Sequence, residues 1–219
     1  MSFYGEIFEI TALSLQISGL ATGISLLLGL PLGTLLALGK FPGRSLLLSL
    51  INTGMGLPPV VVGLFVAIML WRSGPFGDLR LIYTPAAIII AQVIISFPVV
   101  AGLTTSALQA LDPRLQLQLR GLGASTPQMV WMLWREARMP LLAALMAGFG
   151  AVISEVGASM MVGGNIRYQT RVLTTAIVLE TGKGQFEMAI GLSVLLLTIT
   201  FLVNWALTVI QQRSLRRGQ

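Results

Sequence analysis

The sequence predicts an all-α membrane protein in which five helices cross the bilayer and residues 1–219 form a single transmembrane domain. Three observations lead to this fold class. The composition is 55% hydrophobic and only 10% charged, and the mean hydropathy is +0.85, which is too apolar for a soluble domain of this length. The charged residues fall between long apolar runs, and the basic ones are divided unevenly among the connections.

Five apolar runs are long enough to form helices that cross a bilayer, which takes about 20 residues each. They cover residues 10–39, 45–71, 81–111, 139–162 and 188–212. Glu155 is the single charged residue within them. The segment before the first run has two acids and no base, unlike a cleaved signal peptide, so we expect the first run to be retained.

Lysine and arginine set the orientation when successive connections are assigned to alternate sides of the membrane. One side receives nine of them, namely Lys40, Arg44, Arg114, Arg120, Arg135, Arg138, Arg213, Arg216 and Arg217. The other side receives five, namely Arg72, Arg80, Arg167, Arg171 and Lys183. Because basic connections stay in the cytoplasm, the N-terminus is predicted to be outside and the C-terminus inside.

Prolines interrupt three of the predicted spans. Pro31 lies in the first span, Pro98 in the third, and Pro58-Pro59 in the second, where Asn52, Thr53, Gly54 and Gly56 precede them. Proline removes a backbone donor and clashes with the preceding turn, so each site predicts a kink or a break. The carbonyl groups freed there must face protein or water, and broken helices of this kind often line transport pathways.

The segment 112–140 is the one long stretch suited to water. Asp112-Pro113 and Thr126-Pro127 are helix-start signals, and glycines lie between them. They predict a helix from Pro113 to about Leu122, a reversal at Gly123 and a second helix from Pro127 toward the next span. The alternation of leucine and glutamine over 115–119 would also fit a strand, but the caps favour a helical hairpin.

Small residues follow one face of the fourth predicted span, at Ala144, Gly148, Ala151 and Ala158, and Glu155 lies on the same face. This stripe lets another helix approach closely and turns Glu155 toward that helix or a cavity. Glu155 is therefore either a pathway or gate residue or a structural contact between helices. Beyond this span, apolar residues in 169–185 predict a short helix at the outer face, bounded by Gly182.

The chain contains no histidine and no cysteine, which removes imidazole acid-base chemistry, thiolate nucleophiles and the usual zinc ligands. We therefore expect no enzyme and no metal site. The glycines before Lys40 and at 121–123 lack the spacing of phosphate or dinucleotide loops, so no cofactor is expected. The basic residues lie in short loops and indicate membrane topology rather than nucleic-acid binding.

Four motifs carry a resemblance to a known family. They are GLGAS at 121–125, REAR at 135–138 with Pro140, ISEVGA at 153–158 continuing through VGGNI at 162–166, and Thr170-Arg171 followed by LTTAI at 173–177. In order and spacing they resemble the membrane subunit, or permease, of bacterial ABC importers for molybdate, tungstate and sulfate, most closely the tungstate-type permease. The resemblance covers about half of the chain.

The resemblance implies a type I importer permease in the inner membrane, paired as a homodimer. It also implies an ATPase subunit on the cytoplasmic side and an extracytoplasmic binding protein that delivers an oxyanion. The loop that docks on the ATPase would comprise Leu119, Arg120, Gly121, Leu122, Gly123, Ala124 and Ser125. The chain departs from the family pattern at 117–119, where many permeases have Glu-Ala-Ala, and at 135–136, where Leu-Pro is usual.

The same motifs place the candidate pathway or gate residues at Ser154, Glu155, Gly157, Asn165, Thr174 and Thr175. An ionised Glu155 would repel a dianion, so we expect it to hold a gate or a helix contact. The hydroxyl groups of Ser154, Thr174 and Thr175 suit weak contacts with a passing oxyanion, which must also leave.

The sequence thus predicts an ATP-driven permease for tungstate or a related oxyanion, working by alternating access. An ATP-driven permease of the same kind for molybdate, sulfate or another small solute is a second possibility. An ion-coupled secondary transporter that uses Glu155 is a third, from a different class, and it would not need the hairpin at 112–140.

Overall fold

The computed structural model describes residues 3–216, and every regular element in this part of the chain is a helix. The α-helices are α1 Phe3–Leu38, α2 Arg44–Met55, α3 Pro59–Leu70, α4 Pro85–Gln109, α5 Pro113–Gly121, α6 Thr126–Glu136, α7 Arg138–Ile153, α8 Gly157–Gly163, α9 Leu173–Gly182 and α10 Phe186–Arg216, and η1 Gly77–Leu79 is a 3₁₀ turn. The all-α prediction is confirmed. Arg217, one of the nine basic residues counted above, lies outside the described residues.

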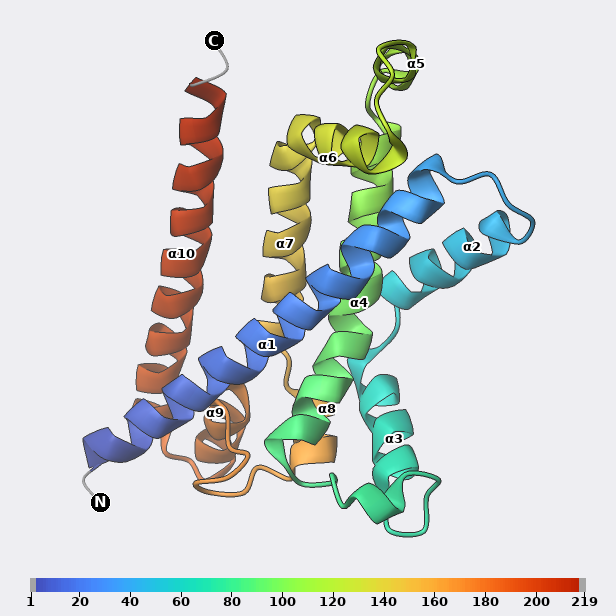
Figure 1. Cartoon of the computed structure of the whole chain (residues 1–219). Helices are drawn as coiled ribbons and strands as arrows, with labels where there is room; N and C mark the ends of the chain where they lie inside the picture. The colour runs from blue at the N-terminus through green and yellow to red at the C-terminus, as the bar shows by residue number, and fades with distance from the viewer. Residues whose placement is uncertain (1–2, 217–219) are drawn as a thin grey trace.

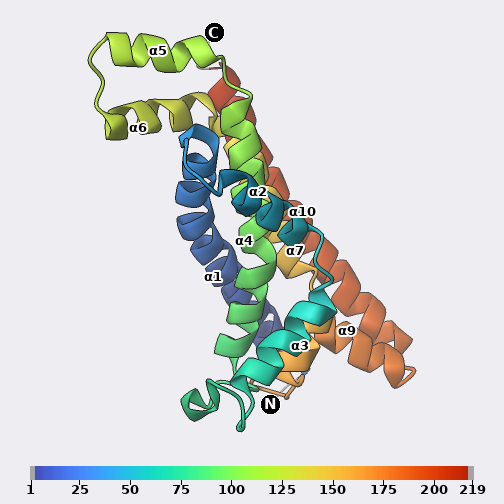
Figure 2. The same cartoon turned by 90° about the vertical axis from the view of Figure 1, so that its right-hand side faces the viewer.

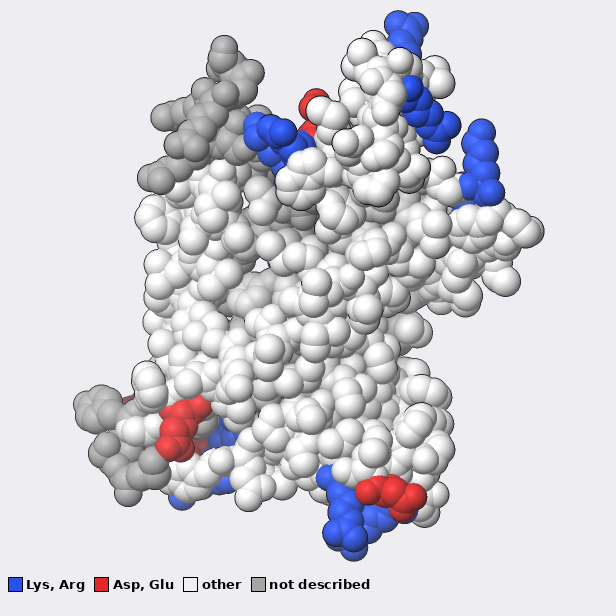
Figure 3. All heavy atoms as spheres, viewed as in Figure 1, with Lys and Arg blue, Asp and Glu red and all other residues white. Residues whose placement is uncertain are grey.

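The connections gather at two opposite ends of the molecule. Figures 1 and 2 show the α5–α6 hairpin, the α1–α2 connection and the end of α10 at one end, and the start of α1, the α3–α4 connection and α8–α9 at the other. Figure 3 shows charged side chains at these ends and an uncharged band between them. The alternation of connections assumed from the sequence is therefore present in the fold.

Three helices are individually long and apolar enough to cross a membrane, namely residues 5–38 of α1, the whole of α4, and residues 186–212 of α10. Two further candidates are bent pairs, α2 with α3 at 104° and α6 with α7 at 75°. The number of spans is thus three, or up to five if each bent pair counts as one.

The prolines differ in their effect. α1 continues through Pro31 and α4 continues through Pro98, so neither proline breaks its helix. α2, by contrast, ends at Met55, and α3 begins at Pro59 after an extended Pro58. Two adjacent prolines remove two successive N–H donors and push the preceding residues out of helical geometry, which a single proline inside a packed helix does not.

The fourth predicted span is not one helix, contrary to the expectation for residues 139–162. α7 ends at Ile153, the chain is non-helical at 154–156, and α8 begins at Gly157. At this break Glu155 Oε1 accepts a hydrogen bond from the Ala158 N–H at 2.9 Å, which satisfies one of the donors that the first turn of α8 leaves free. The predicted stripe of small residues is split between two helices.

Close backbone contacts hold the helices together. α1 packs along α4, where a Cβ on Gly33 would lie 2.6 Å from the Ala101 carbonyl oxygen. α3 packs on α8, where a Cβ on Gly63 would lie 2.7 Å from the Ala158 Cα. α10 packs mainly on α9, and only 11% of its apolar segment is buried.

Candidate functional site

The first half of the hairpin, α5, is defined at both ends by local hydrogen bonds. The Asp112 side chain accepts from the Arg114 N–H at 2.8 Å, which confirms the predicted N-cap. At the other end, Gly123 has φ +78°, the Ala124 N–H donates to the Leu119 carbonyl, and the Gly123 N–H donates to the Arg120 carbonyl, both at 3.0 Å. These two bonds are those of a glycine-terminated helix, and they confirm the predicted reversal.

The second half, α6, begins one residue earlier than the sequence indicated. Ser125, rather than Thr126, is the N-cap residue. The Gln128 side-chain oxygen accepts hydrogen bonds from the Ser125 N–H at 2.9 Å and from its hydroxyl at 3.0 Å. Both bonds join the Gln128 side chain to Ser125, which makes Ser125 the boundary and places Thr126 inside the first turn.

The hairpin has a buried apolar interior and also exposes large apolar side chains on its outer surface. Inside, Leu119 is buried with Met129 and Leu133 in one cluster that also includes Leu108 of α4. Outside, Leu122 is 84% exposed and Leu117 is 69% exposed. The other predicted loop residues, Arg120, Gly121, Gly123 and Ser125, are exposed, and Ala124 is half-buried. Large exposed apolar side chains on a protruding hairpin indicate an interaction surface.

A side-chain contact that the sequence did not reveal connects this hairpin to the membrane helices. The indole N–H of Trp134 on α6 donates to the Thr34 hydroxyl on α1 at 2.9 Å. The two residues are 100 positions apart, and no periodicity or motif relates them. The hairpin is thus attached to α1 as well as to α4 and α7.

Glu155 and Thr174 meet at the break between α7 and α8. Glu155 is only 8% exposed, and its carboxylate caps α8 as described above. Its backbone carbonyl accepts a hydrogen bond from the Thr174 hydroxyl at 2.8 Å. Thr174 lies in the first turn of α9, so one residue joins the break, α8 and α9. Glu155 therefore connects α8 and α9 at the end of α7.

Asn165 and Thr175 form a second contact nearby. The Asn165 side-chain amide donates to the Thr175 carbonyl at 3.3 Å, and the Thr175 hydroxyl accepts from the Val172 N–H at 3.0 Å. Ser154 remains apart, because its side chain is exposed and its hydroxyl donates within α7, to the Gly150 carbonyl at 2.7 Å. Gly157 packs on α3, where a Cβ would lie 2.7 Å from Val60 Cγ2.

Gln92 of α4 completes this region and was not among the predicted residues. It is 2% exposed, and its side-chain amide donates to the Val152 carbonyl at 3.3 Å and to the Ser159 hydroxyl at 3.4 Å. Val152 belongs to α7 and Ser159 to α8, so Gln92 bridges the break. The signal that the sequence offered for it was a glutamine inside a charge-free span.

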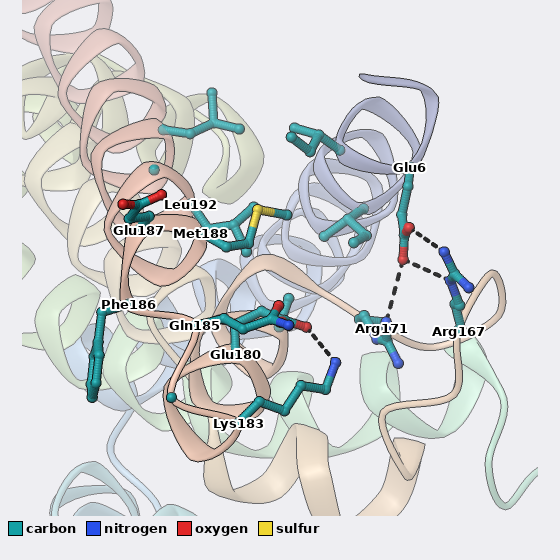
Figure 4. Close-up of a pocket in the computed structure, with 16 residues that line it drawn as sticks. Glu6, Arg167, Arg171, Glu180, Lys183, Gln185, Phe186, Glu187, Met188 and Leu192 are labelled. Atoms are coloured by element: carbon teal, nitrogen blue, oxygen red, sulfur yellow. Dashed lines mark hydrogen bonds and ion pairs between the residues drawn. The ribbon is translucent and has the colours of Figure 1, made fainter. Parts of the chain in front are cut away.

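A separate open cleft of about 1230 Å³ lies at the end opposite the hairpin, between α1, α9 and α10. Figure 4 shows Glu6 facing Arg167 and Arg171, with Nε of Arg167 at 2.8 Å and Nη1 of Arg171 at 3.4 Å from Glu6 Oε1. Lys183 binds Glu180 at 2.8 Å. Hydrogen bonding to Glu6 raises the pKa of the Arg167 guanidinium, which stays charged. Because each cation here has an acidic partner, the cleft lacks the excess positive charge of an anion site.

Long apolar helices, two of them broken and bridged by polar side chains, with a helical hairpin protruding at one end, are features of a membrane permease. The chain belongs to the family of binding-protein-dependent transport system inner membrane components, whose model matches residues 29–216.

Two relatives illustrate this membership. The chain is 41% identical over 201 residues to a probable anion ABC transporter permease protein of Haloferax volcanii, covering 90% of this chain and 87% of that one. It is 38% identical over 212 residues to the tungstate uptake system permease protein TupB of Peptoclostridium acidaminophilum, covering 97% and 93%. The resemblance inferred from the four motifs is therefore confirmed.

Solved structures share the fold. The chain matches a chain of the inward-facing MetNI methionine ABC transporter with a TM-score of 0.76 and 19% identity, over 98% of this chain and 99% of that one. It matches a chain of an amino acid ABC transporter with a TM-score of 0.72 and 20% identity, over 96% and 95%. The chain is thus an inner-membrane permease subunit with a type I ABC importer fold, rather than an enzyme.

Proposed function

We propose that this chain carries an oxyanion, with tungstate as the first candidate, across the inner membrane in an ATP-driven importer. Among its relatives, TupB is named for tungstate uptake and the Haloferax volcanii protein for an anion. The ModB permease of Escherichia coli, named for molybdenum transport, is 27% identical over 220 residues. This difference in identity favours tungstate over molybdate.

The observation that carries the proposal is the α5–α6 hairpin. Its exposed Leu117 and Leu122 have no function in a carrier that works alone, whereas they would be buried on docking to an ATPase subunit. The connections at the hairpin end carry Lys40, Arg44, Arg114, Arg120, Arg135 and Arg138, whereas those at the opposite end carry Arg72, Arg80, Arg167, Arg171 and Lys183. The hairpin end is the cytoplasmic one by the positive-inside rule, which puts the N-terminus outside and the C-terminus inside.

The remaining parts of the assembly follow from the family. An extracytoplasmic binding protein would deliver the oxyanion to the end that holds α8, α9 and the cleft in Figure 4. A second copy of the chain would complete the pathway as a homodimer. The contacts of Glu155, Thr174, Asn165 and Thr175 would then act as a gate, because they join α8 and α9 to α7 near the outer end.

Reconstituted transport tests this proposal. The chain, its ATPase and its binding protein are placed in proteoliposomes, and tungstate uptake is measured with and without ATP. Gly123→Pro should abolish ATP-driven uptake because proline cannot adopt φ +78°. Gly23→Ala is the control, since Gly23 is also exposed, lies within α1 with nothing within 4 Å of an added Cβ, and belongs to neither the docking loop nor the candidate gate. It should leave uptake unchanged.

Two outcomes would contradict the proposal. Uptake that ignores ATP but follows an imposed proton gradient would identify an ion-coupled carrier and give Glu155 the central role. ATP-dependent uptake that prefers molybdate or sulfate over tungstate would support an ATP-driven importer but contradict tungstate as its substrate.

A further inference from the structure

A polar stripe follows one face of α2. Ser45, Ser49, Asn52 and Thr53 recur at the spacing that places side chains on one side of a helix, and all four side chains are exposed. The opposite side of α2 carries Ile51, which is buried in a cluster with Leu36 and Ala101. α2 is therefore amphipathic, although it belongs to a bent pair of helices whose composition suits a membrane span.

These four side chains are unpaired within the described chain. None of them has a hydrogen-bond partner among residues 3–216. α10, whose apolar face is exposed, differs in this respect. Its Thr198, Thr200 and Thr208 each donate to the carbonyl four residues earlier, at 2.7 to 2.8 Å. A hydroxyl group that faces lipid needs a hydrogen bond within its own helix. The unpaired polar side chains of α2 therefore indicate an aqueous environment.

The backbone at the end of the stripe leads to the same conclusion. In a continuing helix, the Met55 carbonyl would accept from residue 58 or 59, but both are prolines without an N–H. Residues 55–58 are exposed as well. Irregular backbone at membrane depth is tolerated only where protein or water satisfies it. Among residues 3–216, no protein covers residues 55–58.

The break after α2 lies next to the break after α7. Val60, at the start of α3, contacts the place where Gly157 would carry a Cβ, at the start of α8. In Figures 1 and 2 both breaks lie between the two charged ends of the molecule. The stripe thus runs from the hairpin end, at Arg44, to the level at which two broken helices meet.

We propose that the polar face of α2 lines the water-filled half of the translocation pathway between the paired breaks and the hairpin end. Ser45, Ser49, Asn52 and Thr53 then give the oxyanion a series of neutral hydrogen-bond donors. The identity of the ion rests on the proposed function. Neutral donors suit this task because a transported dianion must be released at each step, and a fixed positive charge would retain it.

Single cysteine substitutions can test whether the polar face of α2 is exposed to water, because the chain contains no cysteine of its own. Ser49→Cys and Thr53→Cys are introduced separately, and the full chain is assembled with its partners in proteoliposomes. Leu197→Cys on α10 is the matched control, since Leu197 is 69% exposed but lies on the apolar face. We expect a charged methanethiosulfonate reagent to modify positions 49 and 53 about tenfold faster than position 197, because the thiolate forms in water.

Modification at 49 and 53 that is no faster than at 197 would overturn the proposal. So would rapid oxidative cross-linking of two Thr53→Cys chains without labelling, because it would assign this face to a dry contact between two copies. Both readouts are independent of transport, so they hold even if tungstate is not the substrate.

An uptake assay after labelling distinguishes a residue that lines the pathway from one that is only exposed to water. Treatment with the same reagent should reduce tungstate uptake by Thr53→Cys about tenfold or more, because the attached group occupies the route. Uptake by Leu197→Cys and by the cysteine-free chain should be unaffected by the treatment. Full uptake by a completely labelled Thr53→Cys transporter would overturn the pathway assignment. An unmodified chain that takes up no tungstate would contradict the proposed substrate instead.

Discussion

The Trp134 indole N–H on α6 donates to the Thr34 hydroxyl on α1 at 2.9 Å, and Thr34 donates in turn to the Leu30 carbonyl at 2.7 Å. Thr34 is buried and Trp134 is half-buried. The bond connects the hairpin to the longest helix of the described chain. A displacement of α6 therefore reaches α1 directly, in addition to α7, which follows α6 in the chain after a bend of 75°.

Removing this bond should weaken coupling more than folding. Trp134→Phe retains an aromatic ring but no N–H, and we expect it to lower stability by about 1 kcal/mol. The amount of substrate taken up per ATP hydrolysed should fall more steeply. Thr34→Val removes the acceptor, and the double variant should be no worse than either single one, because the two residues share one interaction. An unchanged uptake-to-hydrolysis ratio in Trp134→Phe would show that the bond transmits nothing.

Gly63 and Gly23 provide a matched pair for testing the α3–α8 contact. A Cβ on Gly63 would lie 2.7 Å from the Ala158 Cα, whereas a Cβ on Gly23 of α1 would meet nothing within 4 Å. Gly63→Ala should therefore lower stability by about 1–3 kcal/mol through overpacking. Gly23→Ala should be neutral, or stabilising by up to about 1 kcal/mol, because alanine is the better helix former. Thermal unfolding in detergent measures both, and equal midpoints would contradict the close approach.

The features that the sequence predicted correctly depend on local or physical constraints. The thickness of the bilayer sets the length of the apolar runs, and α1, α4 and α10 fall within three of them apart from their ends. The hairpin was also predictable, because Asp112 and Gly123 act on backbone groups within five residues. Ser125 was missed by one position because both Ser125 and Thr126 are acceptable caps, and only the Gln128 contact distinguishes them.

The features that were missed depend on tertiary contacts or on rare local chemistry. The N-cap of α8 is Val156, which is not one of the residues that usually cap helices, and the side chain that bonds to the first turn is that of Glu155, one position earlier. The sequence therefore gave no reason to end α7 there. Pro31 suggested a kink or a break, but α1 is packed so closely on α4 at Gly33 that it continues. The bond between Trp134 and Thr34 links residues that share no pattern at all.

The ion pairs of Glu6 with Arg167 and Arg171 should make the stability of the protein depend on salt concentration. Glu6 accepts hydrogen bonds from Arg167 and Arg171 and so attaches α1 to the connection before α9. Glu6→Gln should lower the midpoint of thermal unfolding in low salt. The difference from the unmodified chain should shrink as salt is raised from about 0.01 M to about 1 M, because the Debye length falls from about 30 Å to about 3 Å.

Glu9→Gln is the control for this effect. Glu9 is half-buried on the same helix and has no ion-pair partner among the described residues. Its replacement should not change the midpoint at either salt concentration. A loss that is equal for the two variants, or that does not depend on salt, would mean that the Glu6 ion pairs do not hold α1 in place.

Two substitutions of Glu155 distinguish a structural role in capping α8 from a role as an ion-binding site. Glu155→Gln retains an Oε1 acceptor for the Ala158 N–H, which lies 2.9 Å from that atom. Glu155→Ala removes the acceptor and leaves a buried N–H unpaired, which should cost about 1–3 kcal/mol. We therefore expect the alanine variant to unfold at lower temperature and to lose uptake, while the glutamine variant remains close to the unmodified chain in both.

The glutamine variant is the more informative of the two, because it removes the negative charge of Glu155 and keeps the hydrogen bond to Ala158. A carrier that moves a proton or a cation on the Glu155 carboxylate cannot work with an amide in its place. Measuring uptake and the unfolding midpoint together separates the two mechanisms. A Glu155→Gln chain that is as stable as the unmodified one but takes up no substrate would show that the ionised carboxylate, rather than the cap, is what transport needs.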